Sequence, residues 1–160
     1  MAVEILYLVR HSKAEGAHPR GDRHRFLSDE GVARIVALSP EAQRQGFQPD
    51  FAVSSSYRRA LQTRELFLPG FGADRLATLR ALSPESDPQE AFEELKILES
   101  QGFSRIAVFT HNPLVTSLAE LLLTSGLVSS PEFHTPTLLA IGFESGLQRG
   151  AGRQLWVLNP

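Results

Sequence analysis

Three short apolar segments, residues 3–9, 51–53 and 106–110, restrict the fold of this 160-residue chain more than any other feature. Each is rich in branched or aromatic side chains and is followed at once by polar residues. Runs of this kind predict strands that are buried on both faces of a sheet. The segments between and after them have helical periodicity and are separated by Gly and Pro. We therefore predict an α/β fold with a mostly parallel central sheet and helices on both faces.

Four helices are predicted from their start and stop signals. The first begins after Ser28, whose hydroxyl is able to cap it, and Pro40 should kink or interrupt it before Gly46. The apolar stripe that this helix should bury consists of Val32, Ile35, Val36 and Leu38.

The remaining helices have signals of the same local kind. A second helix should follow Ser56, and a third should open at Asp87, which precedes a first-turn proline, and stop at Gly102. A fourth should begin near Pro113 and end at Gly126, with leucines repeating on one face.

The tail contains two further strand patterns, residues 137–143 and 154–158, joined by a glycine-rich turn. Such a pair predicts antiparallel strands at the C-terminal edge of the sheet. No repeat, low-complexity segment or break in composition marks a linker, and 42% hydrophobic residues are enough to fill one core. We therefore predict a single domain over residues 1–160.

Charge and composition argue against several classes of function. The net charge of −2 provides no basic excess, which argues against nucleic-acid binding and against attraction to an anionic membrane. The chain has no cysteine, so it has neither a disulfide nor a cysteine-ligated metal. No apolar run approaches the roughly 20 residues that cross a bilayer, and the first apolar segment is too short for a signal peptide. We expect a cytoplasmic protein.

Polar side chains follow all three predicted parallel strands. Arg10 and His11 follow the first, serines 54–56 with Arg58 and Arg59 follow the second, and His111 follows the third. Because ligands of open α/β sheets bind beyond the carboxyl ends of the strands, these side chains should converge on one pocket. Forked guanidinium donors and imidazoles suit a dianionic phosphoryl group.

Four segments around these residues resemble a known family: Leu-Val-Arg-His at residues 8–11, Leu-Ser-Asp-Glu-Gly at 27–31, Ser-Ser-Tyr-Arg-Arg-Ala-Leu-Gln-Thr at 55–63, and Thr-His-Asn-Pro-Leu at 110–114. Together they are similar to the motifs of the phosphoglycerate mutase-like histidine phosphatase superfamily, and most of all to its small SixA-type phosphohistidine phosphatases. The resemblance covers most of the chain and implies a three-layer α/β/α sandwich.

The resemblance also implies a mechanism. His11 would attack phosphorus through a neutral ring nitrogen, forming a phosphohistidine that water then hydrolyses. Arg10, Arg59 and His111 would stabilise the charge on the equatorial oxygens of the transition state. Alignment with the family motif selects Arg59 over Arg58. No metal and no cofactor are implied.

Ser12 and Asn112, which follow the two histidines, are predicted substrate-binding residues. Ser12 stands where many family members have glycine. The family's larger members, which cleave phosphate esters, use a carboxylic acid to protonate the leaving oxygen, and the chain offers only Glu85 as a weak candidate. A phosphohistidine substrate needs such an acid less, because a protonated imidazole is a good leaving group. The missing acid thus favours a nitrogen–phosphorus bond as substrate, and the resemblance implies phosphohistidine on a small phosphorelay-type protein domain.

Two other functions are compatible with these residues. One is a phosphatase for a small metabolite phosphate ester, and the other is a module that binds phosphorylated proteins without turnover. A mutase is disfavoured because the chain has little room for the insertions that build a sugar-phosphate site. A serine hydrolase is disfavoured because no Gly-x-Ser-x-Gly motif occurs.

One polar segment, residues 18–25, is basic and has no periodicity. A metal site made from His18, Asp22 and His24 is conceivable. We favour a mobile loop near the mouth of the pocket that is able to contact an acidic partner.

Overall fold

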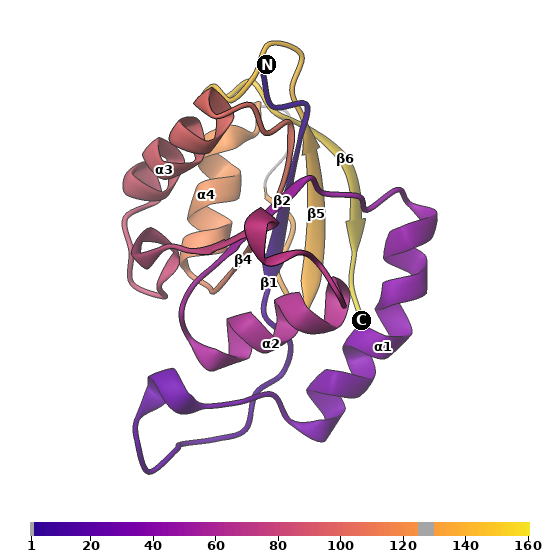
Figure 1. Ribbon diagram of the computed structural model, residues 1–160, viewed down its shortest axis with the longest axis vertical. Helices are drawn as coiled ribbons and strands as arrows, with labels where there is room; N and C mark the ends of the chain where they lie inside the picture. Colours follow the sequence, from indigo (N-terminus) through magenta and orange to yellow (C-terminus); the bar gives the residue numbers. More distant parts are fainter. Residues whose placement is uncertain (1, 125–129) are drawn as a thin grey trace.

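A computed structural model of the chain describes residues 2–124 and 130–160. At its centre is a six-stranded sheet with strand order β3-β2-β4-β1-β5-β6 (Figure 1). The strands are β1 (Ile5–Arg10), β2 (Phe51–Ser54), β3 (Leu76–Thr78), β4 (Arg105–Thr110), β5 (Thr137–Gly142) and β6 (Arg153–Leu158). Strands β1 to β4 pair in parallel, whereas β5 is antiparallel to β1 and to β6. The predicted mostly parallel sheet with an antiparallel C-terminal edge is confirmed.

The α-helices of the described residues cover the two faces of the sheet (Figure 1). They are α1 (Asp29–Arg44), α2 (Arg58–Phe67), α3 (Pro88–Ser100) and α4 (Leu114–Leu122). Helices α1 and α2 contact each other, and so do α3 and α4. The fold is therefore the predicted three-layer α/β/α sandwich. Because all six strands belong to one sheet, we propose that residues 1–160 form a single domain.

Strand β1 is covered on both faces, and this explains why its sequence is mostly apolar. Leu6 and Leu8 pack into the core beneath α3 and α4, while Tyr7 and Val9 pack into the core beneath α1 and α2. Successive side chains of a strand point to opposite faces, so a strand covered on both faces has no position for a polar side chain.

Helix α1 confirms its predicted start and corrects two predictions about its course. The Ser28 hydroxyl accepts a hydrogen bond from the Gly31 backbone N–H at 3.0 Å, as an N-cap should. The helix is not interrupted at Pro40, and Val36 is 64% exposed instead of buried. The two errors are connected, because the carbonyl that Pro40 leaves without a helical donor belongs to Val36. Both residues lie on the exposed side of the helix, where water is able to satisfy that carbonyl.

The other predicted elements are found with shifted ends. The Asp87 side chain caps α3 by accepting from the Gln89 N–H at 2.9 Å, and Gly102 ends the segment at φ 100°. Helix α4 ends at Leu122, and the predicted stop at Gly126 lies outside the described residues. The edge strand β3 is not predicted by the sequence, because three half-exposed residues are too few to show periodicity.

No helix among residues 2–124 and 130–160 combines the length and apolar character needed to span a bilayer.

The first turn of α1 leaves no room for a side chain at Gly31. A Cβ there would lie 2.0 Å from the carbonyl oxygen of Lys13, which is backbone and has little freedom to move. We expect Gly31→Ala to lower the free energy of unfolding by about 3 kcal/mol, measured by urea denaturation, because the helix must shift away from the loop after β1. Gly16→Ala is the control, since a Cβ at Gly16 meets nothing within 4 Å. Equal stability of the two variants would contradict the close packing at Gly31.

Candidate active site

The carboxyl ends of three adjacent strands, β2, β4 and β1, carry the predicted site residues. Arg10 is the last residue of β1 and pairs with Thr110 at the end of β4. The His11 backbone N–H donates to the Thr110 carbonyl at 3.0 Å, and the ring centroids of His11 and His111 are 5.1 Å apart. Parallel pairing therefore brings the two histidines together, although they lie far apart in the sequence.

His11 is held in the tautomer that leaves Nε2 with a lone pair. Its Nδ1 lies 2.7 Å from the carbonyl oxygen of Ser12, so Nδ1 carries the proton and donates it to that carbonyl. The ring is only 8% exposed. Burial lowers the pKa of His11 from 6.5 to about 4. The hydrogen bond to Ser12 opposes this shift, whereas the charges of Arg59 and Arg10 add to it. The imidazole is therefore neutral at pH 7, with a lone pair on Nε2.

This pKa is open to direct measurement. Burial disfavours the imidazolium, so the neutral ring should persist as the pH falls below 6.5 and be lost only near pH 4. Long-range ¹H–¹⁵N spectra of the wild type should show a proton on Nδ1 and none on Nε2 throughout that interval, with the His11 signals assigned by their absence in His11→Gln. A midpoint near 6.5 would contradict this assignment.

Arg59 lies in the first turn of α2 and is 5% exposed, whereas its neighbour Arg58 is exposed. Its Nε donates to His11 Nε2 at 3.3 Å. Its Nη1 donates to the Asp22 carbonyl at 2.9 Å, and its Nη2 donates to the Asp22 carboxylate at 3.1 Å. The structure therefore places Arg59, and not Arg58, against the predicted nucleophile.

Two further residues of α2 support the site. The Thr63 hydroxyl accepts from the backbone N–H of Ser12 at 3.0 Å, and the Gln62 side chain accepts from the backbone N–H of Leu27 at 2.8 Å. One turn of helix thus holds both the loop after β1 and the segment that leads into α1. This explains why Gln and Thr follow Arg59 at fixed spacing in the sequence.

His111 is 1% exposed and has an oriented ring. Its Nε2 lies 2.7 Å from the Ser55 hydroxyl oxygen. That oxygen accepts a hydrogen bond from the backbone N–H of Tyr57 at 3.1 Å. Its Nδ1 has no hydrogen-bond partner among the described residues. Burial, followed by the charges of His11 and Arg59, lowers the pKa of His111 to about 2. The ring is therefore neutral, with one nitrogen available to a ligand.

Arg10 is anchored beside the same pocket. Its Nη1 donates to the Phe133 carbonyl at 2.7 Å, while its Nε has no partner among the described residues. The guanidinium thus retains donors for an anion.

Of the three other predicted residues, two form side-chain hydrogen bonds and one is exposed. The Ser12 hydroxyl donates to the Gly31 carbonyl at 2.7 Å and so holds α1 against the loop, which is a supporting role. The Asn112 side-chain oxygen accepts from the Thr116 hydroxyl at 2.6 Å. Glu85 is exposed ahead of α3, without a hydrogen bond or ion pair in the described part of the chain. Substrate contacts by Ser12 and Asn112, and an acid role for Glu85, stay predictions.

The segment from His18 to Arg25 lies against the site through Asp22, which sequence reasoning considered only as a metal ligand. The Asp22 carboxylate binds Arg25 and Arg59, and His18 Nδ1 accepts from the Arg20 N–H at 3.0 Å. No cluster of three metal-ligating side chains is found in the described ranges. The sequence around Asp22 has no periodicity and so does not indicate that its side chain lies at the site. The tertiary structure reveals this through the contact with Arg59.

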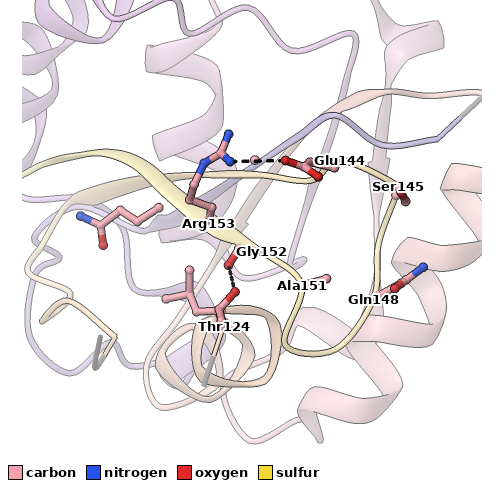
Figure 2. A pocket seen from close by; sticks show the side chains of 11 residues that line it. Thr124, Glu144, Ser145, Gln148, Ala151, Gly152 and Arg153 are labelled. Atoms are coloured by element: carbon pink, nitrogen blue, oxygen red, sulfur yellow. Dashed lines mark hydrogen bonds and ion pairs between the residues drawn. The ribbon is translucent and has the colours of Figure 1, made fainter. Parts of the chain in front are cut away.

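A separate cavity of about 440 Å³ lies at the other end of the sheet. Figure 2 shows the residues that line it. On one side the Thr124 hydroxyl donates a hydrogen bond to the Gly152 carbonyl. On another, Arg153 at the start of β6 forms an ion pair with Glu144, with 3.7 Å between Nη1 and Oε1. None of the predicted site residues lines this cavity.

Comparisons with known proteins find one matching family model. The model of the histidine phosphatase superfamily (branch 1) matches residues 6–83. A search of curated proteins finds no significant match.

Solved structures with similar folds are numerous. A protein assigned as the phosphohistidine phosphatase SixA of Agrobacterium tumefaciens has a TM-score of 0.84 at 20% identity, with both chains covered completely. The protein histidine phosphatase SixA complexed with tungstate has a TM-score of 0.82 at 24% identity, covering 96% of each chain. Phosphoserine phosphatase of Entamoeba histolytica, complexed with 3-phosphoglyceric acid, has a TM-score of 0.66 at 11% identity, covering 98% of this chain and 97% of that one. At these identities the likeness establishes the shared fold.

Proposed function

We propose that this chain, whose residues 6–83 match the model of the histidine phosphatase superfamily (branch 1), hydrolyses the phosphoryl group of protein phosphohistidine through a covalent intermediate on His11. One observation supports the proposal above the others. The Nδ1–H of His11 is held by the Ser12 carbonyl, which leaves the lone pair on Nε2, close to the charges of Arg59 and Arg10.

The reaction takes two displacements at phosphorus. In the first, His11 Nε2 forms a P–N bond as the bond to the leaving group breaks, and Nδ1–H keeps the charge of the phosphoimidazole close to the Ser12 carbonyl. In the second, water attacks phosphorus and His11 regains its lone pair as phosphate leaves. Donors from Arg10, Arg59 and His111 hold the equatorial oxygens in both steps. We propose that neither step needs a metal ion or a cofactor.

The acidic groups near the site favour a nitrogen–phosphorus bond as substrate. Desolvation acts to raise the pKa of Asp22, but the hydrogen bond from Arg25 and the charge of Arg59 outweigh it, so the net pKa is lowered. Asp22 is therefore ionised at pH 7 and holds no proton for a leaving alkoxide. A leaving imidazole, protonated from solvent, needs no such donor.

A basic rim beside the site favours a protein as the carrier of that phosphoryl group. We define the rim as His18, Arg20, Arg23 and His24. Arg20 and Arg23 are exposed and form no ion pair within the described residues, and Arg23 reaches the Ser56 hydroxyl at 2.6 Å. Such a rim steers an acidic protein surface toward the pocket.

The double variant Arg20→Glu/Arg23→Glu tests this role of the rim. We expect kcat/KM for a phosphohistidine protein with an acidic surface to fall about tenfold at low salt, and kcat/KM for free phosphohistidine to change little. The control is Arg75→Glu/Arg149→Glu, which makes the same charge change at exposed positions outside the rim. Equal losses on both substrates would show that the rim does not act by docking a protein.

Phosphate release, measured in EDTA, tests the function itself. The purified chain is incubated with a phosphohistidine-bearing protein and with a panel of phosphate monoesters. Release from the first substrate in preference to the second supports the proposal. Release from esters alone would make the chain a metabolite phosphatase, and binding without release would make it a phosphoprotein-binding module.

A further inference from the structure

All three nitrogens of the Arg59 guanidinium are occupied in this structure. The Nε group donates to the lone pair of His11, and the two Nη groups donate to the backbone carbonyl and the carboxylate of Asp22. The same N–H groups are the ones that a bound phosphoryl group would use, because forked guanidinium donors match an oxyanion in the way that they match a carboxylate.

This arrangement differs from the one that the chemistry requires. His11 Nε2 has a single lone pair, which must be directed at phosphorus for the bond to form. Here that lone pair accepts a hydrogen bond at 3.3 Å from Arg59. Arg59 must therefore turn its Nε group away from His11 before attack, and because the guanidinium is a rigid plane, its two contacts with Asp22 shift with it.

Asp22 is suited to an exchange of this kind. Its side chain is 55% exposed, whereas that of Arg59 is 6% exposed, so the carboxylate can move into water at little cost while the guanidinium stays buried. Its second carboxylate oxygen is bound by Arg25 at 3.0 Å, which keeps the charge beside the pocket.

We infer that Asp22 is a positioning residue whose carboxylate binds the Nη groups of Arg59 while no substrate is present. When substrate binds, its phosphoryl group replaces the Asp22 carboxylate on Arg59. Asp22 thus keeps a buried guanidinium paired while the pocket is empty, and it competes with weak anions for the site. A dianionic phosphoryl group displaces it because it offers Arg59, Arg10 and His111 more oxygens than one carboxylate does. The inference rests on the proposed function, since it assumes that phosphate binds beside His11.

The competing view is that Asp22 holds Arg59 in its working orientation. The two views predict opposite changes in affinity. If Asp22 competes with phosphate, its removal tightens binding, whereas if it orients Arg59 for phosphate, its removal weakens binding.

Binding of inorganic phosphate and of tungstate to Asp22→Asn, measured by calorimetry, separates them. We expect both anions to bind about tenfold more tightly than to the wild type, and KM for a phosphohistidine substrate to fall with them. Glu30→Gln is the matched control, because Glu30 also loses one exposed negative charge but pairs with Lys13 and Arg34 instead of Arg59. Its affinities should stay within about twofold of the wild type.

Each outcome decides between the views. Unchanged or weaker binding by folded Asp22→Asn would overturn the inference and leave the proposed function intact, and so would an equal gain in Glu30→Gln. If neither the wild type nor Asp22→Asn binds either anion, the phosphate site itself is wrong, and the inference falls with the proposed function.

Discussion

The His11→Ala variant should lose turnover of a phosphohistidine substrate by at least about 10⁴-fold, because it lacks the atom that we propose to form the covalent bond to phosphorus. No other described imidazole can replace it at the same point. The ring of His111, 5.1 Å away, is buried and has its Nε2 against Ser55. The remaining donors of the pocket should still bind phosphate, so binding is expected to survive while turnover does not.

Two measurements test this prediction. Phosphate attached to the protein is trapped by rapid quench in alkali, and an alkali-stable, acid-labile phosphoenzyme is expected in the wild type alone. His134→Ala is the control, because it removes an imidazole whose side chain is 50% exposed. Turnover by His11→Ala within about tenfold of the wild type would rule out the covalent role of His11.

Arg59→Ala is expected to lower kcat by about 10²–10³-fold, because it removes a preorganised charge from the water-poor region where the transition-state oxyanion forms. The guanidinium is 5% exposed, so its charge is screened less than that of a surface arginine. Arg59→Lys should recover little of the loss, since an ammonium group has no fork of donors.

The adjacent arginine supplies the control for that experiment. Arg58→Ala removes the same side chain from an exposed position of the same helical turn, and kcat for a small phosphorylated substrate should stay within about twofold. Circular dichroism establishes that both variants fold. Equal losses in the two variants would mean that the burial of Arg59 against His11 has no part in catalysis.

Local patterns predicted most of the fold. The strand runs ending near Val9 and Thr110, the cap at Ser28 and the N-terminus of α3 at Asp87 were all predicted, because each depends on residues close together in the chain. The errors at Pro40 and Val36 have a tertiary origin, since the outward side of α1 is set by its packing against the sheet.

The sequence by itself determined which residue types follow the parallel strands, and therefore that His11, Arg59 and His111 share one end of the sheet. The strand order and the parallel register then bring these side chains together. The tertiary structure alone decided how they are used: which nitrogen of His11 is free, that Ser55 orients His111, and that Asp22 binds Arg59. These contacts depend on the path of irregular backbone and on the depth of burial, which set the hydrogen-bond partners and pKa values and have no periodic signature in the sequence.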